Sequence, residues 1–147
     1  SSTDSKERFQ FINNGDTYYG SGSGHYFRYN GTTRLSLDSS GNLTAVGNVG
    51  AYSDMALKED IYEIENALDK VKKLRGVHFT KKADKSKEIG VVANEVEKVV
   101  PELVDEVKDE QLGKIKTMKY ANTVGLLIEA VKDLSKQIEE LKNGSTN

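Results

Sequence analysis

Ser53 and Lys58 are the two residues of this chain best suited to chemistry, and Asp54 directly follows the serine. A serine hydroxyl is a weak nucleophile until a base removes its proton, and a neutral lysine amine is one of the few side chains that can do so. We therefore interpret Ser53 as a candidate nucleophile and Lys58 as its candidate general base. Asp54 is a supporting candidate that orients the turn or a water, and an N-cap or local turn role suits it equally. The alternative for the whole string is an N-cap followed by a solvated lysine.

The five-residue spacing between Ser53 and Lys58 restricts how the two side chains can meet. In a helix they would point about 140° apart, and in a strand they would lie about 16 Å apart. The chain must therefore bend between them, or the lysine must come from a neighbouring subunit. A lysine in water has a pKa of about 10.4, so a lysine base also needs an apolar or cationic setting. Met55, Leu57 and Ile61 are the residues that could supply it.

Composition defines the broad class of the chain. Its 147 residues include no Cys and one Pro, and the net charge is -2 with a pI near 5.8. No disulfide can form, and nothing in this charge balance points to a nucleic acid or an anionic membrane as partner. No apolar run approaches the roughly 20 residues of a membrane span, so we expect a soluble protein. His25 and His78 are isolated, and we interpret them as structural, expecting no metal and no cofactor.

The first part of the chain predicts short strands joined by tight turns. Alternating apolar and polar residues occupy 8–12, 25–29 and 33–37, and turn residues follow at 14–16, 30–31 and 40–42. About fifty residues of sparsely apolar strands cannot bury a core alone, so we expect other copies of the chain to cover them. Aromatic residues in this region could form a sugar-binding surface, although packing inside interwoven strands is the favoured interpretation. They are Tyr18, Tyr19, Tyr26 and Tyr29.

The C-terminal part carries the heptad pattern of a left-handed coiled coil about 30 Å long. The apolar positions, here called the seam, alternate in spacing between four and three residues: Tyr120, Val124, Leu127, Val131, Leu134, Ile138 and Leu141. The pattern predicts that several copies meet along about 120–142, with dimer and trimer both open. The alternative is an amphipathic helix packed on its own domain. Ile128 and Ala130 widen the apolar stripe, which indicates packing on the globular part or on more than one neighbour.

Between these two parts the sequence predicts a compact α+β module. The expected elements are a helix over 64–75, strands at 77–80 and 88–92, a short helix ending at Pro101, and a hairpin of 103–107 with 114–118.

The order of these blocks resembles a known family. SDMALKEDI, ENALDKVKKLRGVHF, IGVVANEVEKVVPELV, KIKTMKY and LLIEAVKDLSKQIEEL follow one another from Ser53 to Leu141. Together they resemble the self-cleaving intramolecular chaperone domain that ends phage tail spikes, tail fibres and neck appendages, endosialidase tail spikes among them. A related domain occurs in the myelin regulatory transcription factor. The preceding LSLDSSGNLTAVGNVGAYSD is similar to the end of a fibre shaft. One departure is Asn94, where many members carry Gln.

The resemblance implies a homotrimer whose C-terminal domain folds its own upstream β-rich shaft and is then released. It implies a shaft end over 1–52, a chaperone domain over 53–147, and a scissile bond between Tyr52 and Ser53. Ser53 would attack the carbonyl of Tyr52 with Lys58 as general base, and the resulting ester would be hydrolysed. Attack on the serine's own preceding carbonyl and attack across subunits both stay open.

The expected fold is therefore α+β, as an intertwined homotrimer with a strand-rich shaft end and a C-terminal coiled coil. Three functions are compatible with the sequence. The favoured one is a single-turnover Ser-Lys autopeptidase that assembles a phage fibre in the host cytoplasm, leaving the mature shaft in the virion. The others are a non-cleaving structural fibre tip and a carbohydrate-binding tip.

Overall fold

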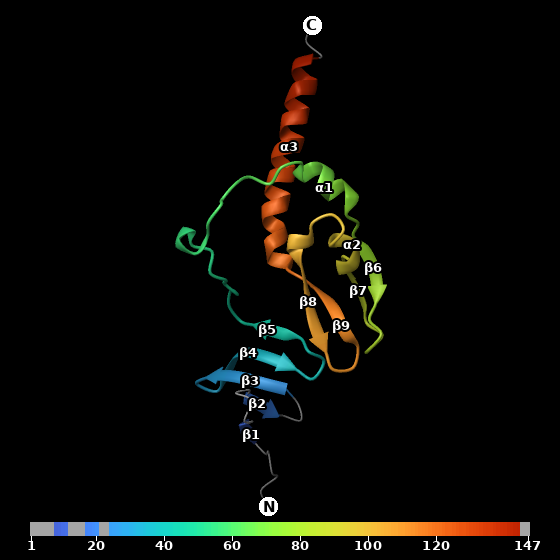
Figure 1. Cartoon of the computed structure of the whole chain (residues 1–147). Helices are drawn as coiled ribbons and strands as arrows, with labels where there is room; N and C mark the ends of the chain where they lie inside the picture. Colours follow the sequence, from blue (N-terminus) through green and yellow to red (C-terminus); the bar gives the residue numbers. More distant parts are fainter. Residues whose placement is uncertain (1–7, 12–16, 21–23, 145–147) are drawn as a thin grey trace, which may run out of the picture. The chain divides into compact units, whose positions relative to one another are not determined.

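The computed structural model describes residues 8–11, 17–20 and 24–144 and divides into two compact units, Ser1–Glu59 and Asp60–Asn147. The elements combine antiparallel strand pairs with helices, and a long helix ends the chain (Figure 1). The predicted α+β class is confirmed. The domain boundary expected between Tyr52 and Ser53 stays a prediction. No helix in the described part of the chain has the length and apolar character needed to cross a bilayer.

The first unit consists of antiparallel strands. β1 (Arg8–Phe11) pairs with β2 (Thr17–Gly20), and β3 (Gly24–Tyr29), β4 (Thr32–Asp38) and β5 (Leu43–Ala45) form a sheet in that order. The strands expected near 8–12, 25–29 and 33–37 are confirmed. β2 and β5 were not predicted, because β2 contains two adjacent tyrosines and β5 has three residues, so neither shows a clear alternation. The expected turn at 14–16 lies outside the described residues.

Local turn chemistry explains the register of the three-stranded sheet. Asn30 and Gly31 both have positive φ, 48° and 77°, as a two-residue hairpin turn requires. After β4, the Asp38 carboxylate accepts the backbone N–H groups of Ser40 and Asn42, each over 2.9 Å. These bonds lower the pKa of Asp38, the Asn42 side-chain bond being the largest contribution. Among residues 24–59 none is buried, so this unit has no core in the part whose side chains the structure describes.

The second unit contains the remaining elements. They are α1 (Ala67–Lys73), β6 (Val77–Thr80), β7 (Lys87–Gly90), α2 (Ala93–Val96), β8 (Val104–Asp109), β9 (Gly113–Met118) and α3 (Thr123–Gly144). β6 pairs with β7 and β8 with β9, so both predicted strand pairs are confirmed. Two 3-10 turns, Pro101–Leu103 and Tyr120–Asn122, precede β8 and α3.

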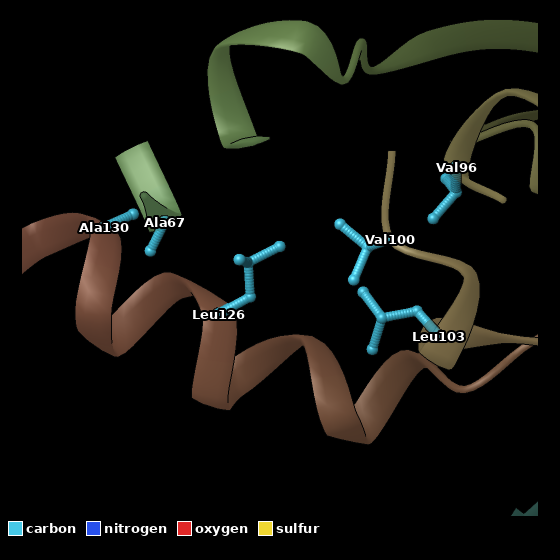
Figure 2. Close-up of a cluster of buried hydrophobic side chains, with 6 residues drawn as sticks. All are labelled: Ala67, Val96, Val100, Leu103, Leu126 and Ala130. Atoms are coloured by element: carbon cyan, nitrogen blue, oxygen red, sulfur yellow. The ribbon is translucent and has the colours of Figure 1, made fainter. Parts of the chain in front are cut away.

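The core of this unit lies where α1 and the segment from α2 to β8 meet α3 (Figure 2). Its buried side chains are Ala67, Val96, Val100, Leu103, Leu126 and Ala130. Ala67 and Ala130 face each other across the contact between α1 and α3, and their small side chains let the two helices approach closely.

Two helix predictions were wrong in extent. The helix expected over 64–75 spans only Ala67–Lys73, because Asn66 adopts a left-handed conformation with φ of 54° that a right-handed helix cannot include. Ile61 and Ile64, assigned to its apolar face, therefore precede it. The helix expected to end at Pro101 ends at Val96, and the proline instead opens a 3-10 turn. The strand expected to reach residue 92 ends at Gly90, since Val92 occupies the N-cap position of α2.

Candidate active site

A single 3-10 turn, Met55–Leu57, bends the chain directly after Ser53. It lies in the green segment between β5 and α1 (Figure 1). The backbone N–H of Leu57 donates to the carbonyl of Asp54 over 3.2 Å, and the N–H of Lys58 donates to the carbonyl of Met55 over 3.0 Å. Lys58 then returns to extended backbone, with φ of -133° and ψ of 145°. The chain therefore departs from both helix and strand between the two candidate residues.

The bend brings the side chains of Ser53 and Lys58 together. Lys58 Nζ donates a hydrogen bond to Ser53 Oγ over 2.7 Å. Of the two arrangements that the spacing allowed, the structure has the bend within one chain. The distance is within the range over which a general base acts on a hydroxyl. Catalysis by the two residues stays a prediction.

Asp54 is the N-cap residue of the same turn. Its Oδ1 accepts the backbone N–H of Ala56 over 2.8 Å, and its own backbone is extended, as is usual for an N-cap. Of the roles considered for Asp54, the capping role is therefore the one that the structure shows.

The three apolar residues expected to shield Lys58 are exposed in this single chain. Met55 is 76% exposed, Leu57 66% and Ile61 65%. The expectation that these residues shield Lys58 from water is therefore wrong for one chain alone. Tyr52, which directly precedes Ser53, is even more accessible, at 96%. Within the described part of the chain, these residues leave Lys58 accessible to solvent.

The widened apolar stripe of α3 is buried along one edge and exposed along the rest. Leu126 and Ala130 are buried against the rest of the unit, so the helix does pack on its own domain. All seven seam residues remain more than 40% exposed, from Ile138 at 44% to Leu141 at 71%. The interpretation of an amphipathic helix packed on its own domain is therefore confirmed for this part of α3. A coiled coil between chains stays a prediction.

Charged pairs that sequence reasoning missed connect elements of the second unit. Arg75 donates twice to the Glu95 carboxylate, over 2.7 and 2.6 Å, and so ties the segment after α1 to α2. The hydrogen bond from Arg75 lowers the pKa of Glu95. Lys116 on β9 pairs with Glu97 at 2.8 Å and with Glu106 at 3.3 Å. The predicted hairpin brings Glu106 opposite Lys116, whereas no local signal identifies Glu95 as the partner of Arg75 or Glu97 as a partner of Lys116.

The remaining candidates gain no chemical role. In the described ranges, no group of three or more His, Asp or Glu side chains is arranged to hold a metal ion. Tyr26 and Tyr29 are 46% and 66% exposed, and the guanidinium of Arg28 lies 5.5 Å from the centre of the Tyr26 ring. The side chains of Tyr18 and Tyr19 lie outside the described part.

Comparison with known proteins shows which proteins this chain is similar to. Residues 53–105 match the model of a peptidase family described as "Chaperone of endosialidase", and the match begins at Ser53. The chain is also similar to long tail fibre proteins of bacteriophages. The resemblance to a phage tail fibre C-terminal chaperone domain is therefore confirmed.

The relatives are individual tail fibre proteins. The long tail fiber protein Gp37 of Enterobacteria phage K3 is 42% identical over 102 residues, which cover 65% of this chain and 8% of that protein. The protein of the same name from Enterobacteria phage M1 is 30% identical over 141 residues, covering 91% of this chain and 47% of the relative. The chain thus spans less than half the length of these relatives.

Proposed function

We propose that this chain is an intramolecular chaperone that assembles the shaft of a phage tail fibre and then releases itself by cutting between Tyr52 and Ser53. The observation that carries the proposal is the 2.7 Å contact between Lys58 Nζ and Ser53 Oγ. The family match that begins at Ser53 supports it independently. The client is the chain's own upstream shaft, and assembly takes place in the host cytoplasm before the shaft enters the virion.

The proposed reaction has two steps. Neutral Lys58 Nζ takes the proton of Ser53 Oγ while the oxygen attacks the carbonyl carbon of Tyr52. The bond from that carbon to the Ser53 nitrogen breaks, and the nitrogen receives the proton from Nζ, leaving an ester between Tyr52 and Ser53 Oγ. Water then hydrolyses the ester. The products are a carboxylate at Tyr52 and a free amine and hydroxyl at Ser53.

We further propose that three copies assemble through α3. The seam residues lie on a face that leaves them roughly half exposed in one chain, whereas Leu126 and Ala130, on the neighbouring face of the helix, are buried. An apolar stripe of this length on a soluble surface marks an interaction site. Heptad spacing favours a coiled coil as the way to bury it.

Assembly also provides what the single chain lacks at the catalytic pair. A lysine base needs an apolar or cationic setting, and Met55, Leu57 and Tyr52 are exposed in one chain. Neighbouring copies that cover these side chains would exclude water from Lys58. Cleavage would then occur only after correct association.

Intact mass spectrometry of the freshly folded full chain tests the proposal. Wild type should break between Tyr52 and Ser53, whereas Ser53→Ala and Lys58→Ala should stay intact while forming trimers of the same size. If wild type stays uncut and forms a stable trimer, the better interpretation would be a structural fibre tip rather than a peptidase. Cleavage that persists in either variant would remove that residue from the mechanism.

A further inference from the structure

We infer that Asp54 is a positioning residue for cleavage at Ser53, and that it acts by capping the turn rather than through its charge. The inference rests on the proposed function, because it concerns how Lys58 is held beside Ser53. Asp54 would touch neither the scissile bond nor the attacking oxygen.

The turn between the two residues is held by few contacts. It spans only Met55–Leu57 and contains no buried residue, so packing within the chain does not fix it. A 3-10 turn has poorer hydrogen-bond geometry than an α-helix and is weak by itself. Three hydrogen bonds define it: the two backbone bonds that end at Leu57 and Lys58, and the 2.8 Å bond from Ala56 N–H to Asp54 Oδ1. The Asp54 carboxylate is the one side chain among these partners.

Losing the turn would separate the catalytic pair. An extended chain places residues five apart at about 16 Å, far beyond the 2.7 Å that joins Ser53 and Lys58 here. A misplacement of about 1 Å at a reacting group can slow a reaction about 100-fold. A cap that keeps the turn populated therefore contributes directly to the rate.

The capping hydrogen bond of Asp54 does not require a negative charge. The hydrogen bond described for its carboxylate goes to the Ala56 N–H, whereas Lys58 Nζ donates to Ser53 Oγ. Asparagine caps as well as aspartate, because its side-chain oxygen accepts the same backbone N–H without a charge. Asp54→Asn therefore keeps the feature that we consider essential, and Asp54→Ala removes it. Asp54→Ser, a shorter capping residue, provides a second rescue.

The experiment follows cleavage of the full chain over time by intact mass for wild type, Asp54→Asn, Asp54→Ser and Asp54→Ala, at several pH values. We expect the two capping variants to cleave within about threefold of wild type and Asp54→Ala to cleave about 10 to 100 times more slowly. The midpoint of the pH profile should be the same for wild type and Asp54→Asn. Asp54→Asn as slow as Asp54→Ala, or Asp54→Ala as fast as wild type, would overturn the inference.

A second measurement does not depend on cleavage. This measurement uses full chains that carry Ser53→Ala. The Ala56 amide should exchange its hydrogen with solvent slowly when position 54 is Asp or Asn, and faster when it is Ala. The assembled mass of each variant shows whether it still folds. Should wild type stay uncut, the proposed function fails, while the Ala56 amide still reports on the cap. Equal exchange in all three variants would refute the capping role itself.

Discussion

Lys58 Nζ contacts Ser53 Oγ within one chain, so a single copy contributes both candidate catalytic side chains. The sequence spacing had left a lysine from a neighbouring subunit equally open. If the contact is the functional one, assembly supplies shielding and not a catalytic residue. Mixed assemblies separate these two contributions.

Co-expression of Ser53→Ala chains with Lys58→Ala chains should give no cleavage. One chain lacks the nucleophile and the other lacks the base in its own turn, so neither contains a complete pair. Intact mass distinguishes the two chains, and native mass spectrometry verifies that mixed trimers form. Cutting of the Lys58→Ala chains in those trimers would show that the lysine acts across subunits.

Leu134→Asp should abolish both trimer formation and cleavage while leaving the second unit folded. Leu134 is 46% exposed and belongs to the seam, so a charge there disfavours burial between helices without disturbing the core. Analytical ultracentrifugation measures the oligomer, and circular dichroism measures the fold.

Ser135→Asp is the matched control for Leu134→Asp, because Ser135 is exposed, follows Leu134 directly in α3 and is not a seam residue. It should assemble and cleave as wild type does. Loss of trimers in both variants would point to helix destabilisation. Trimers in both variants would contradict the proposal that the seam mediates assembly.

Leu126→Ala should destabilise the second unit by about 2–5 kcal/mol, the usual cost of a cavity left by a buried leucine. Leu126 is 3% exposed and lies at the centre of the cluster in Figure 2. Urea unfolding of the uncut Ser53→Ala protein at fixed concentration measures the change. Leu112→Ala, outside the seam and at a position 75% exposed, should cost less in the same experiment.

Acid should weaken the link between Arg75 and Glu95. The Arg75 hydrogen bond lowers the pKa of Glu95 below its ordinary value of 4.5. A carboxylate with a lowered folded-state pKa stabilises the fold above its ordinary pKa, and that contribution is lost as pH falls through the folded value. Arg75→Gln should therefore lower the melting temperature near pH 6 and make progressively less difference below about pH 4.5.

Lys72→Gln provides the control for the acid experiment, because Lys72 and Asp69 form an exposed pair at 3.7 Å. Pairs of this kind contribute about 0–1 kcal/mol. The melting temperature should change little at either pH. A pH-independent effect of Arg75→Gln would show that the arginine acts through packing and not through the charge of Glu95.

The sequence predicted features that local pattern determines. The turn at Asn30 and Gly31 predicted a hairpin because both residues tolerate positive φ. The β8 and β9 hairpin followed from alternation around Gly113. The seam followed from spacing alone.

Features that depend on distant partners were not predictable. Asp133 on α3 accepts the backbone N–H of Leu68 over 3.1 Å, next to the start of α1, where Asn66 provides no side-chain cap. No spacing rule connects residues that far apart. The same limit applies to the candidate site: composition suggested that Met55 and Leu57 would shelter the lysine, but only coordinates show that they face solvent.

The absence of buried residues over 24–59 has a consequence for reversibility. Strands without their own core hold their arrangement through association, and the segment proposed to organise that association departs when the chain is cut. A cleaved fibre would then show hysteresis: it would melt once and trace a different path on cooling. An uncut Ser53→Ala chain, which keeps its helix attached, would retrace its own curve. Self-cleavage would thus turn a reversible assembly into one that cannot form again once it has melted.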